Sequence, residues 1–186
     1  MKRIISVLTI LLLLVGCTKN ETIEKVSYTN DVVIDVENVD MSAYNEMSFS
    51  DHNYVGVQMN QIIKMINEGG TSLVFLGYPG CFACNLTVPV LDQAAEDKGV
   101  EILYVKGDNI PNEDFYGFID LVEDHLQEGQ DGEKTVMTPF IFALKDGKIV
   151  SEQTGLPFDY QGGSLTKSQT DKMLDIFYDI IDELKD

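Results

Sequence analysis

The chain of 186 residues has little positive charge: 13 Lys and Arg stand against 31 Asp and Glu, which gives a formal charge of −18. So acidic a chain does not neutralise phosphates, and we expect no nucleic-acid partner. Tryptophan is absent, and three cysteines and two histidines are too few for a disulfide-rich scaffold or a structural zinc set. The rest, 44% hydrophobic and 24% charged, is the composition of a folded domain.

Residues 1–16 have the pattern of a secretory signal. Lys2 and Arg3 precede an apolar run over residues 4–15, which is shorter than the ~20 residues that a spanning helix needs. The segment ends in Leu-Val-Gly followed by Cys17, and this resembles the bacterial lipobox. The resemblance implies cleavage before Cys17, a diacylglycerol on its thiol, and an extracytoplasmic protein lipid-anchored to the bacterial cell membrane. The alternative is a plain signal peptide with an incidental cysteine.

After the signal, the chain divides into an acidic tether, residues 17–54, and one α/β domain, residues 55–186. The tether is polar and lacks a helical period, although residues 32–36 could form a short strand. Apolar periodicity and Gly or Pro punctuation set the elements of the domain. We expect helices at 57–67, 81–97, 112–127 and 166–184, and strands at 72–78, 100–105, 136–144 and 148–153.

Turn and cap residues support these limits. The pair Asp146–Gly147 is a hairpin signal between the last two strands. Thr166 with Gln169 matches a capping box, and Asn112 is a candidate N-cap. The element order, αβαβαββα, joins a parallel β-α-β unit to an antiparallel β-β-α unit.

The candidate redox site is the run Cys81-Phe82-Ala83-Cys84, which opens a helix directly after a buried strand. This spacing places both sulfurs on one helical face, close enough for a disulfide. The helix N-terminus favours a thiolate, which is the species that attacks a disulfide. We therefore expect Cys81 to attack and Cys84 to resolve the mixed disulfide, with Phe82 and Ala83 facing the substrate.

Two simpler interpretations of the cysteine pair remain open. It could form a structural disulfide, or it could hold a soft metal. A metal site would need further ligands, and His52 and His125 are the candidates of that type. Both histidines lie in polar sequence, where a surface position is the simpler expectation, so we predict no metal.

A wider set of residues carries a family resemblance: Cys81, Cys84, Pro89, Thr138 and Pro139. With them, residues 55–185 resemble the thioredoxin family, which implies a thioredoxin-like fold, a central mixed β-sheet flanked by helices, here with an N-terminal extension. The resemblance also implies that Pro139 is cis and lies beside the cysteines, that Thr138 contacts the substrate, and that Thr138 and Pro139 together position the partner strand. Within the family, residues 75–95 are similar to the bacteriocin transport accessory proteins and related thioredoxin-like lipoproteins.

The chain departs from the thioredoxin pattern around its cysteines. Phe75 stands where thioredoxin has a buried aspartate, and Asn85 stands where a basic residue is common. No Lys, Arg or His occurs from residue 65 through residue 97. The thiolate of Cys81 would then be favoured mainly by the helix terminus, and only modestly.

These features predict a membrane-anchored, extracytoplasmic thiol–disulfide oxidoreductase that needs no cofactor. Its partner would be a cysteine-containing exported protein or a membrane electron donor, and we expect a monomer. The alternative is a redox-inactive binding or accessory module for exported peptides or proteins. In that case the cysteines would only lock the start of a helix.

Overall fold

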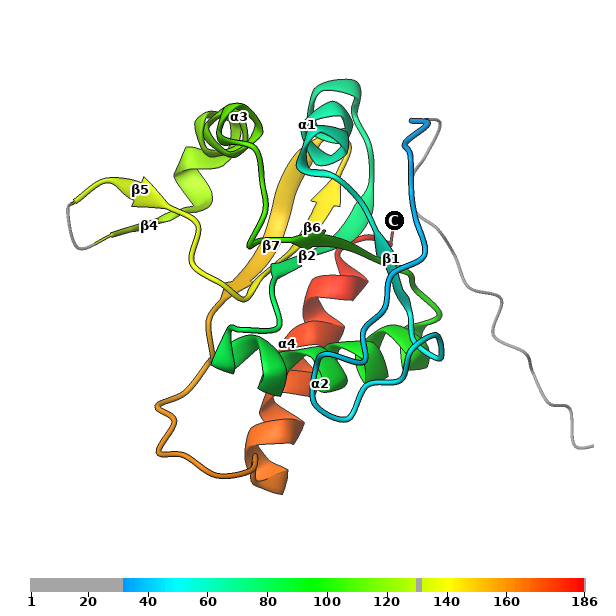
Figure 1. Cartoon of the computed structure of the whole chain (residues 1–186), viewed down its shortest axis with the longest axis vertical. Helices are drawn as coiled ribbons and strands as arrows, with labels where there is room; N and C mark the ends of the chain where they lie inside the picture. Colours follow the sequence, from blue (N-terminus) through cyan, green and yellow to red (C-terminus); the bar gives the residue numbers. More distant parts are fainter. Residues whose placement is uncertain (1–31, 130–131, 186) are drawn as a thin grey trace, which may run out of the picture.

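The computed structural model describes residues 32–129 and 132–185, and the expected signal peptide and Cys17 lie outside this part of the chain. A mixed sheet has the strand order β1-β3-β2-β6-β7. Its strands are β1 (Tyr54–Gly56), β2 (Ser72–Gly77), β3 (Ile102–Lys106), β6 (Phe140–Lys145) and β7 (Lys148–Thr154). The helices are α1 (Met59–Glu68), α2 (Phe82–Lys98), α3 (Asn112–Val122) and α4 (Lys167–Asp182). Figure 1 shows α1 and α3 on one face of the sheet and α2 and α4 on the other.

The centre of the sheet is built from apolar strands that are buried on both faces. β2 is buried at every position and pairs in parallel with β3 and antiparallel with β6. Such burial on both faces is what a continuous apolar run predicts. β6 turns into β7 at Asp146 and Gly147, whose φ angles of 50° and 74° are those of a tight hairpin. The expected hairpin is confirmed.

The core lies in two layers, one on each face of the sheet. The layer under α2 and α4 contains Phe75, Leu91, Ile102, Phe177 and Ile181. The layer under α1 and α3 contains Ile62, Met65, Leu103, Phe118 and Phe142. Because β2, β3 and β6 send alternate side chains to each layer, the sheet is anchored from both sides.

The helix limits follow local capping chemistry. Thr166 and Gln169 form the expected capping box at the start of α4. α2 contains Pro89 and ends at Gly99, which adopts a left-handed conformation with φ 67°. The prediction that Asn112 caps α3 is wrong. Pro111 is the cap, and its carbonyl accepts the amide of Phe115 at 2.9 Å, so Asn112 is already inside the helix.

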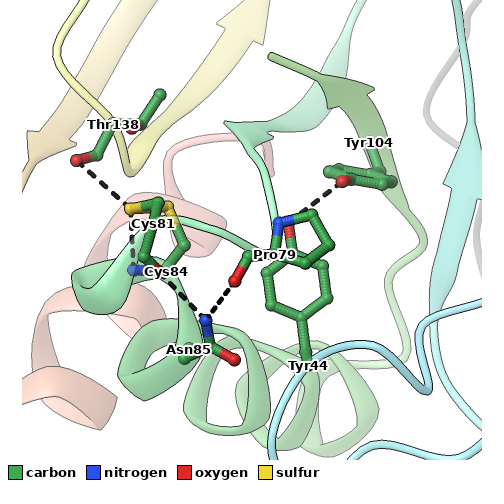
Figure 2. The surroundings of a disulfide bond; sticks show 7 residues. All are labelled: Tyr44, Pro79, Cys81, Cys84, Asn85, Tyr104 and Thr138. Atoms are coloured by element: carbon green, nitrogen blue, oxygen red, sulfur yellow. Dashed lines mark hydrogen bonds between the residues drawn. A yellow bond between two sulfur atoms is a disulfide. The ribbon is translucent and has the colours of Figure 1, made fainter. Parts of the chain in front are cut away.

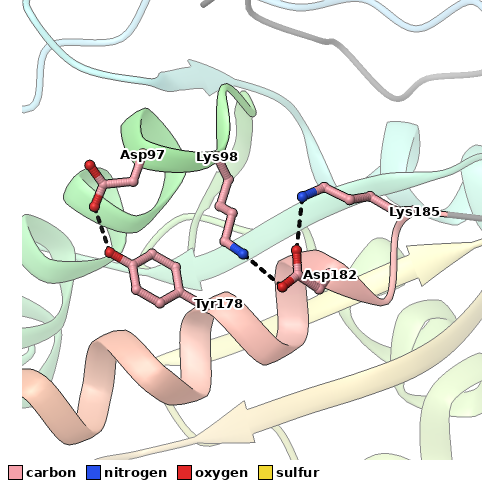
Figure 3. Close-up of polar contacts among 5 residues, drawn as sticks. All are labelled: Asp97, Lys98, Tyr178, Asp182 and Lys185. Carbon is pink, nitrogen blue, oxygen red and sulfur yellow. Dashed lines mark hydrogen bonds and ion pairs between the residues drawn. The ribbon is translucent and has the colours of Figure 1, made fainter.

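Two contacts on the surface join α2 to α4 (Figure 3). The Tyr178 hydroxyl donates to Asp97 at 2.5 Å, and Lys98 pairs with Asp182 at 2.6 Å. Lys185 also reaches Asp182, at 2.8 Å, and together the two lysines hold the pKa of Asp182 below its usual range. Exposed ion pairs of this kind contribute at most about 1 kcal/mol each, so the buried side chains hold the two helices together.

The N-terminal extension packs on the domain from residue 32 onward. Met41 and Tyr44 are buried in the layer beneath α2, although both precede the expected domain boundary at residue 55. Residues 32–36 do not form the possible short strand, and side chains of α1 bind two of their backbone groups. Lys64 donates to the Val33 carbonyl at 2.5 Å, and Gln61 accepts the amide of Asp35 at 3.1 Å.

Three other elements differ from the expectation. β1 is a three-residue edge strand that pairs with β3 and was not predicted. The third expected helix ends at Val122, followed by a 3₁₀ turn, η1 (Glu123–His125), and by a small hairpin of β4 (Gln127–Glu128) and β5 (Lys134–Thr135). β6 begins at Phe140 rather than at residue 136, since Pro139 has no N–H to donate to the sheet.

Candidate functional site

Cys81 and Cys84 lie at the junction between β2 and α2, as the sequence predicted, and they form a disulfide with Cα atoms 5.2 Å apart. Cys81 is the N-cap of α2, and its Sγ accepts the amide of Cys84 at 3.1 Å (Figure 2). The two residues differ in access: Cys81 is 8% exposed and Cys84 is 0% exposed. Only Cys81 can therefore be reached by another molecule without opening the fold.

The loop before β6 lies directly against the reactive pair. The bond between Thr138 and Pro139 is cis, which confirms that expectation. The Thr138 carbonyl oxygen lies 3.7 Å from the Sγ of Cys81, and the loop is held in turn by a hydrogen bond from the amide of Gly155 to the Pro139 carbonyl at 2.8 Å. Thr138 is therefore next to the sulfur of Cys81, and substrate contact through Thr138 stays a prediction.

The two residues between the cysteines have different environments. Phe82 is 58% exposed, while Ala83 is partly buried against the core. The ring of Phe82 meets that of Tyr160 with 5.0 Å between centroids. Tyr160 belongs to the loop before α4, about eighty residues later, and nothing in the local sequence pattern pointed to it. Phe82 is therefore the accessible member of the dipeptide and forms an aromatic surface beside Cys81.

Asn85 holds the loop that precedes α2 by two hydrogen bonds and binds the extension by a third. Its Nδ2 donates to the Pro79 carbonyl at 2.6 Å and to the Cys81 carbonyl at 3.0 Å (Figure 2). Its Oδ1 accepts the amide of Asn45 from the N-terminal extension at 3.2 Å. The residue that replaces the usual cation thus connects the extension to the backbone of Cys81, a role that sequence reasoning missed.

The surroundings of Cys84 are aromatic rather than acidic. A Cβ on Gly77 would lie 3.0 Å from the Cys84 Sγ and 2.5 Å from the ring of Phe75, so both side chains face one point. The Phe75 ring in turn stacks on Tyr104, with 5.6 Å between centroids. At the position where thioredoxin carries a buried carboxylate, this chain therefore has a hydrocarbon ring close to Cys84.

A buried tyrosine pair lies behind this ring. The hydroxyl groups of Tyr44 and Tyr104 are 3.0 Å apart, and Figure 2 shows Tyr44 approaching from the extension. Burial raises the pKa of Tyr44 well above its ordinary range and the pKa of Tyr104 to about 12. Both phenols are therefore neutral at physiological pH, and one donates its proton to the other.

The two histidines are engaged elsewhere. His52 bonds through Nε2 to the Val39 carbonyl at 3.1 Å, and His125 bonds to Glu152 at 3.2 Å. Across residues 32–129 and 132–185, no cluster of three or more His, Cys, Asp or Glu side chains could hold a metal ion. The structure thus does not bring either histidine to the cysteine pair as a ligand.

Comparison with known proteins finds similar structures, whereas no family model and no curated protein matches. A thioredoxin from Aeropyrum pernix is 20% identical over 53% of this chain and 73% of its own, with a TM-score of 0.39. Oxidised thioredoxin O2 from Arabidopsis thaliana is 15% identical over 56% of this chain and 84% of its own, with a TM-score of 0.39. The chain's own sheet order, its helices on both faces and its cysteine pair beside Thr138–Pro139 define a thioredoxin-like fold with an N-terminal extension.

Proposed function

We propose that the protein is a thiol–disulfide oxidoreductase whose redox pair is Cys81 and Cys84. The observation that carries this proposal is the unequal access of two bonded sulfurs at a helix N-terminus. Exchange needs one sulfur that a partner can reach and a second one held close behind it. Cys81 and Cys84 meet these two requirements, in this order.

The reaction needs only the sulfurs and a partner. The Cys81 thiolate attacks one sulfur of a partner disulfide, the partner's S–S bond breaks, and its other sulfur leaves as a thiolate. The Cys84 sulfur, once deprotonated, attacks the Cys81 sulfur of the mixed disulfide. This step forms the Cys81–Cys84 bond and releases the partner dithiol, so that the partner is reduced and the protein is oxidised. Reversing the steps oxidises the partner.

Several groups support these steps. The helix terminus and the Cys84 amide, 3.1 Å from Sγ, stabilise negative charge on Cys81. The nearby Thr138 carbonyl can accept the proton of the Cys81 thiol in the reduced form. At the position of the thioredoxin carboxylate, Cys84 has the Phe75 ring, which cannot accept its proton when the mixed disulfide is resolved.

Replacing the resolving cysteine tests the function against its alternative. Cys84→Ser should leave a mixed disulfide between Cys81 and its partner, seen as a higher-mass adduct on a non-reducing gel that a reductant removes. Cys81→Ser is the matched control and should trap no such adduct through position 81. A redox-inactive binding module, or a purely structural disulfide, would give no adduct with Cys84→Ser either.

We further propose that Cys17 is lipidated and that the enzyme acts outside the cytoplasm of a bacterial cell. The support is the signal-like sequence of residues 1–16 and the lipobox resemblance. Within the described residues, no helix is long and apolar enough to cross a bilayer. Cys17→Ser should move the protein from the detergent phase to the aqueous phase in a detergent partition. The partner would then be an exported cysteine-containing protein or a membrane electron donor.

The finer family placement is also a proposal. The stretch 75–95 is similar to the bacteriocin transport accessory proteins and related thioredoxin-like lipoproteins. A lipid-anchored exchanger of this type would serve disulfides of exported chains near the membrane. Mass spectrometry of the adducts trapped by Cys84→Ser identifies these chains, and adducts confined to cytoplasmic proteins would contradict the placement.

A further inference from the structure

An open groove of about 490 Å³ runs along the outer side of α2, next to the cysteine pair. We call it the α2 groove. Its lining comes from three parts of the chain: residues 45–47 of the extension, the first three turns of α2, and residues 163–165 with the start of α4. Hydrogen bonds hold both of its edges. Asn45 is tied to Asn85, and the Tyr160 hydroxyl donates to the Gly163 carbonyl.

The lining of the α2 groove is partly apolar, and the charged residues in it are all acidic. Leu86, Pro89 and Val90 supply apolar surface from α2. Glu46 and Asp92 supply carboxylates, and no Lys, Arg or His is among the lining residues. The Asp92 carboxylate accepts the backbone amide of Asn53 at 2.7 Å and its side-chain amide at 3.1 Å, and both donors are neutral.

The cations on the neighbouring part of α4 have other partners. Lys167 pairs with Asp171 at 2.6 Å, and Lys172 donates to the Pro157 carbonyl at 2.6 Å. A cationic side chain would therefore find complementary charge in the α2 groove, and an acidic one would be repelled.

The α2 groove begins one residue after Cys81. Phe82 lines it and directly follows Cys81, and Asn85 lines it while donating to the Cys81 carbonyl at 3.0 Å. The carbonyl oxygen of Thr138 lies 3.7 Å from the sulfur of Cys81. A chain joined to the Cys81 sulfur can therefore lay its flanking residues in the groove.

Glu46 lies on the groove wall in an exposed turn with an unusual backbone conformation. Its φ is 63°, in the left-handed region, where glycine and asparagine are favoured over glutamate. Residues other than glycine in this region are more frequent at functional sites, where the surrounding structure offsets the energetic cost of the backbone conformation. Glu46 thus lines the groove although its backbone conformation is unfavourable for glutamate.

We infer that the α2 groove selects the partner: it binds the segment flanking the partner's reacting cysteine and favours an aliphatic residue beside Lys or Arg. This inference rests on the proposed exchange function and adds a substrate class to it. The aliphatic side chain contacts Leu86 and Val90, and the cation lies near Glu46 and Asp92.

Two short peptides test the inference, one with Leu-Lys and one with Leu-Glu before a cysteine that carries thionitrobenzoate as a mixed disulfide. Attack by reduced protein on the peptide sulfur releases coloured thionitrobenzoate, so its rate reports recognition. At 0.15 M salt, where distant charges are screened, wild type should prefer the Leu-Lys peptide. Glu46→Gln should reduce that preference by about twofold to fivefold, and Glu46→Lys should reduce it further.

Asp120 supplies matched controls, because it is exposed on α3, on the opposite face of the sheet. Asp120→Asn and Asp120→Lys change the net charge by the same amounts as the Glu46 variants and should leave the preference unchanged. Equal losses in both series, or no preference in wild type, would overturn the inference.

A second measurement separates this inference from the exchange function. The Leu-Lys peptide with Ser in place of Cys is added to the disulfide form and followed by NMR. Shifts at residues 45–47, 86–93 and 163–165 are expected, and shifts confined to other regions would refute the groove. If reduced protein released thionitrobenzoate no faster than free glutathione while these shifts appeared, the exchange function would fail and the groove would stand.

Discussion

Cys81 is placed in an environment that offers dipoles but little positive charge. The Cys84 amide lies 3.1 Å from its sulfur, and the segment from residue 65 through residue 97 contains no Lys, Arg or His. The Asn85 side chain stabilises the backbone of the loop and supplies no charge to the thiolate. The helix terminus therefore acts against the field of a chain with formal charge −18.

This balance predicts how Cys81 reacts with an alkylating reagent. The rate of alkylation of reduced Cys81 should rise with pH to a midpoint above about 6, well above the most activated cysteines of this fold. Asn85→Lys should shift the midpoint downward, because it adds a cation one residue after the pair. Asn85→Gln is the neutral control. A wild-type midpoint well below about 6 would contradict this account.

Tyr44 and Tyr104 predict a loss of stability at high pH. An unfolded tyrosine ionises near pH 10, whereas burial raises the pKa of Tyr104 to about 12 and that of Tyr44 further. A raised pKa means that the stabilisation is complete below about pH 10 and is lost as the pH rises toward 12. Urea unfolding at pH 8 and pH 11 should show the lower midpoint at pH 11.

Two variants isolate the tyrosine pair from other alkaline effects. Tyr44→Phe removes one of the two phenols that share a hydrogen bond and should make the free energy of unfolding less dependent on pH over this range. Tyr116→Phe changes an exposed ring and should leave that dependence as in wild type. An equal pH dependence in both variants would contradict the assignment.

At single residues, what a sequence can predict depends on the distance along the chain. The cysteine pair is visible because its signal spans four residues, and Pro139 follows from the family resemblance. Asn45 and Asn85 are in contact although forty residues separate them, and almost eighty residues separate Phe82 from Tyr160. Neither contact produces a periodic pattern or a motif in the sequence, so only the structure reveals these members of the site.

Among the elements, the N-terminal extension has the largest unexpected role. Met41 is fully buried and Tyr44 nearly so, both against core residues beneath α2. Asn45 then reaches the active-site loop through Asn85. The part of the extension from residue 32 is therefore integral to the domain and to the α2 groove, rather than a simple tether.

Truncating Met41 measures how much the extension stabilises the fold. Met41→Ala should lower the free energy of unfolding by about 2–5 kcal/mol, the usual cost of a cavity at a fully buried methionine. Val33→Ala is the control within the same extension, because Val33 is 78% exposed and should change stability by less than about 0.5 kcal/mol. Urea denaturation followed by circular dichroism gives both values. A loss for Met41→Ala as small as that for Val33→Ala would show that the extension does not stabilise the domain.

The regular elements were predictable where apolar periodicity is long. β2, α2, β3, β7 and α4 lie close to their expected limits, because each combines a sustained pattern with a Gly, Pro or capping signal. β1 and the β4–β5 hairpin were missed, since strands of two or three residues are too short to show alternation. Burial of Met41 was hidden because its neighbours in sequence are polar, so no stripe marks it.

At the scale of the molecule, acidity links the chemistry to the choice of partner. The formal charge of −18 disfavours a thiolate at Cys81, which weakens the dithiol form relative to the disulfide. Through Glu46 and Asp92, the same acidity favours cationic segments in the α2 groove. Low electrostatic support for the thiolate and selection of basic partners are therefore two consequences of one composition.

The redox potential tests this view of the whole molecule. A poorly stabilised dithiol makes the disulfide the favoured state, so we expect a potential nearer the about −270 mV of thioredoxin than the about −120 mV of DsbA. Equilibration with glutathione or dithiothreitol buffers measures the potential.

By thermodynamic linkage, the disulfide form should also have a higher free energy of unfolding than the dithiol form. Asn85→Lys should raise the potential, because its cation stabilises the thiolate. A wild-type value near −120 mV, or a more stable dithiol form, would show that groups other than the helix terminus stabilise reduced Cys81 and that the protein is poised as an oxidant.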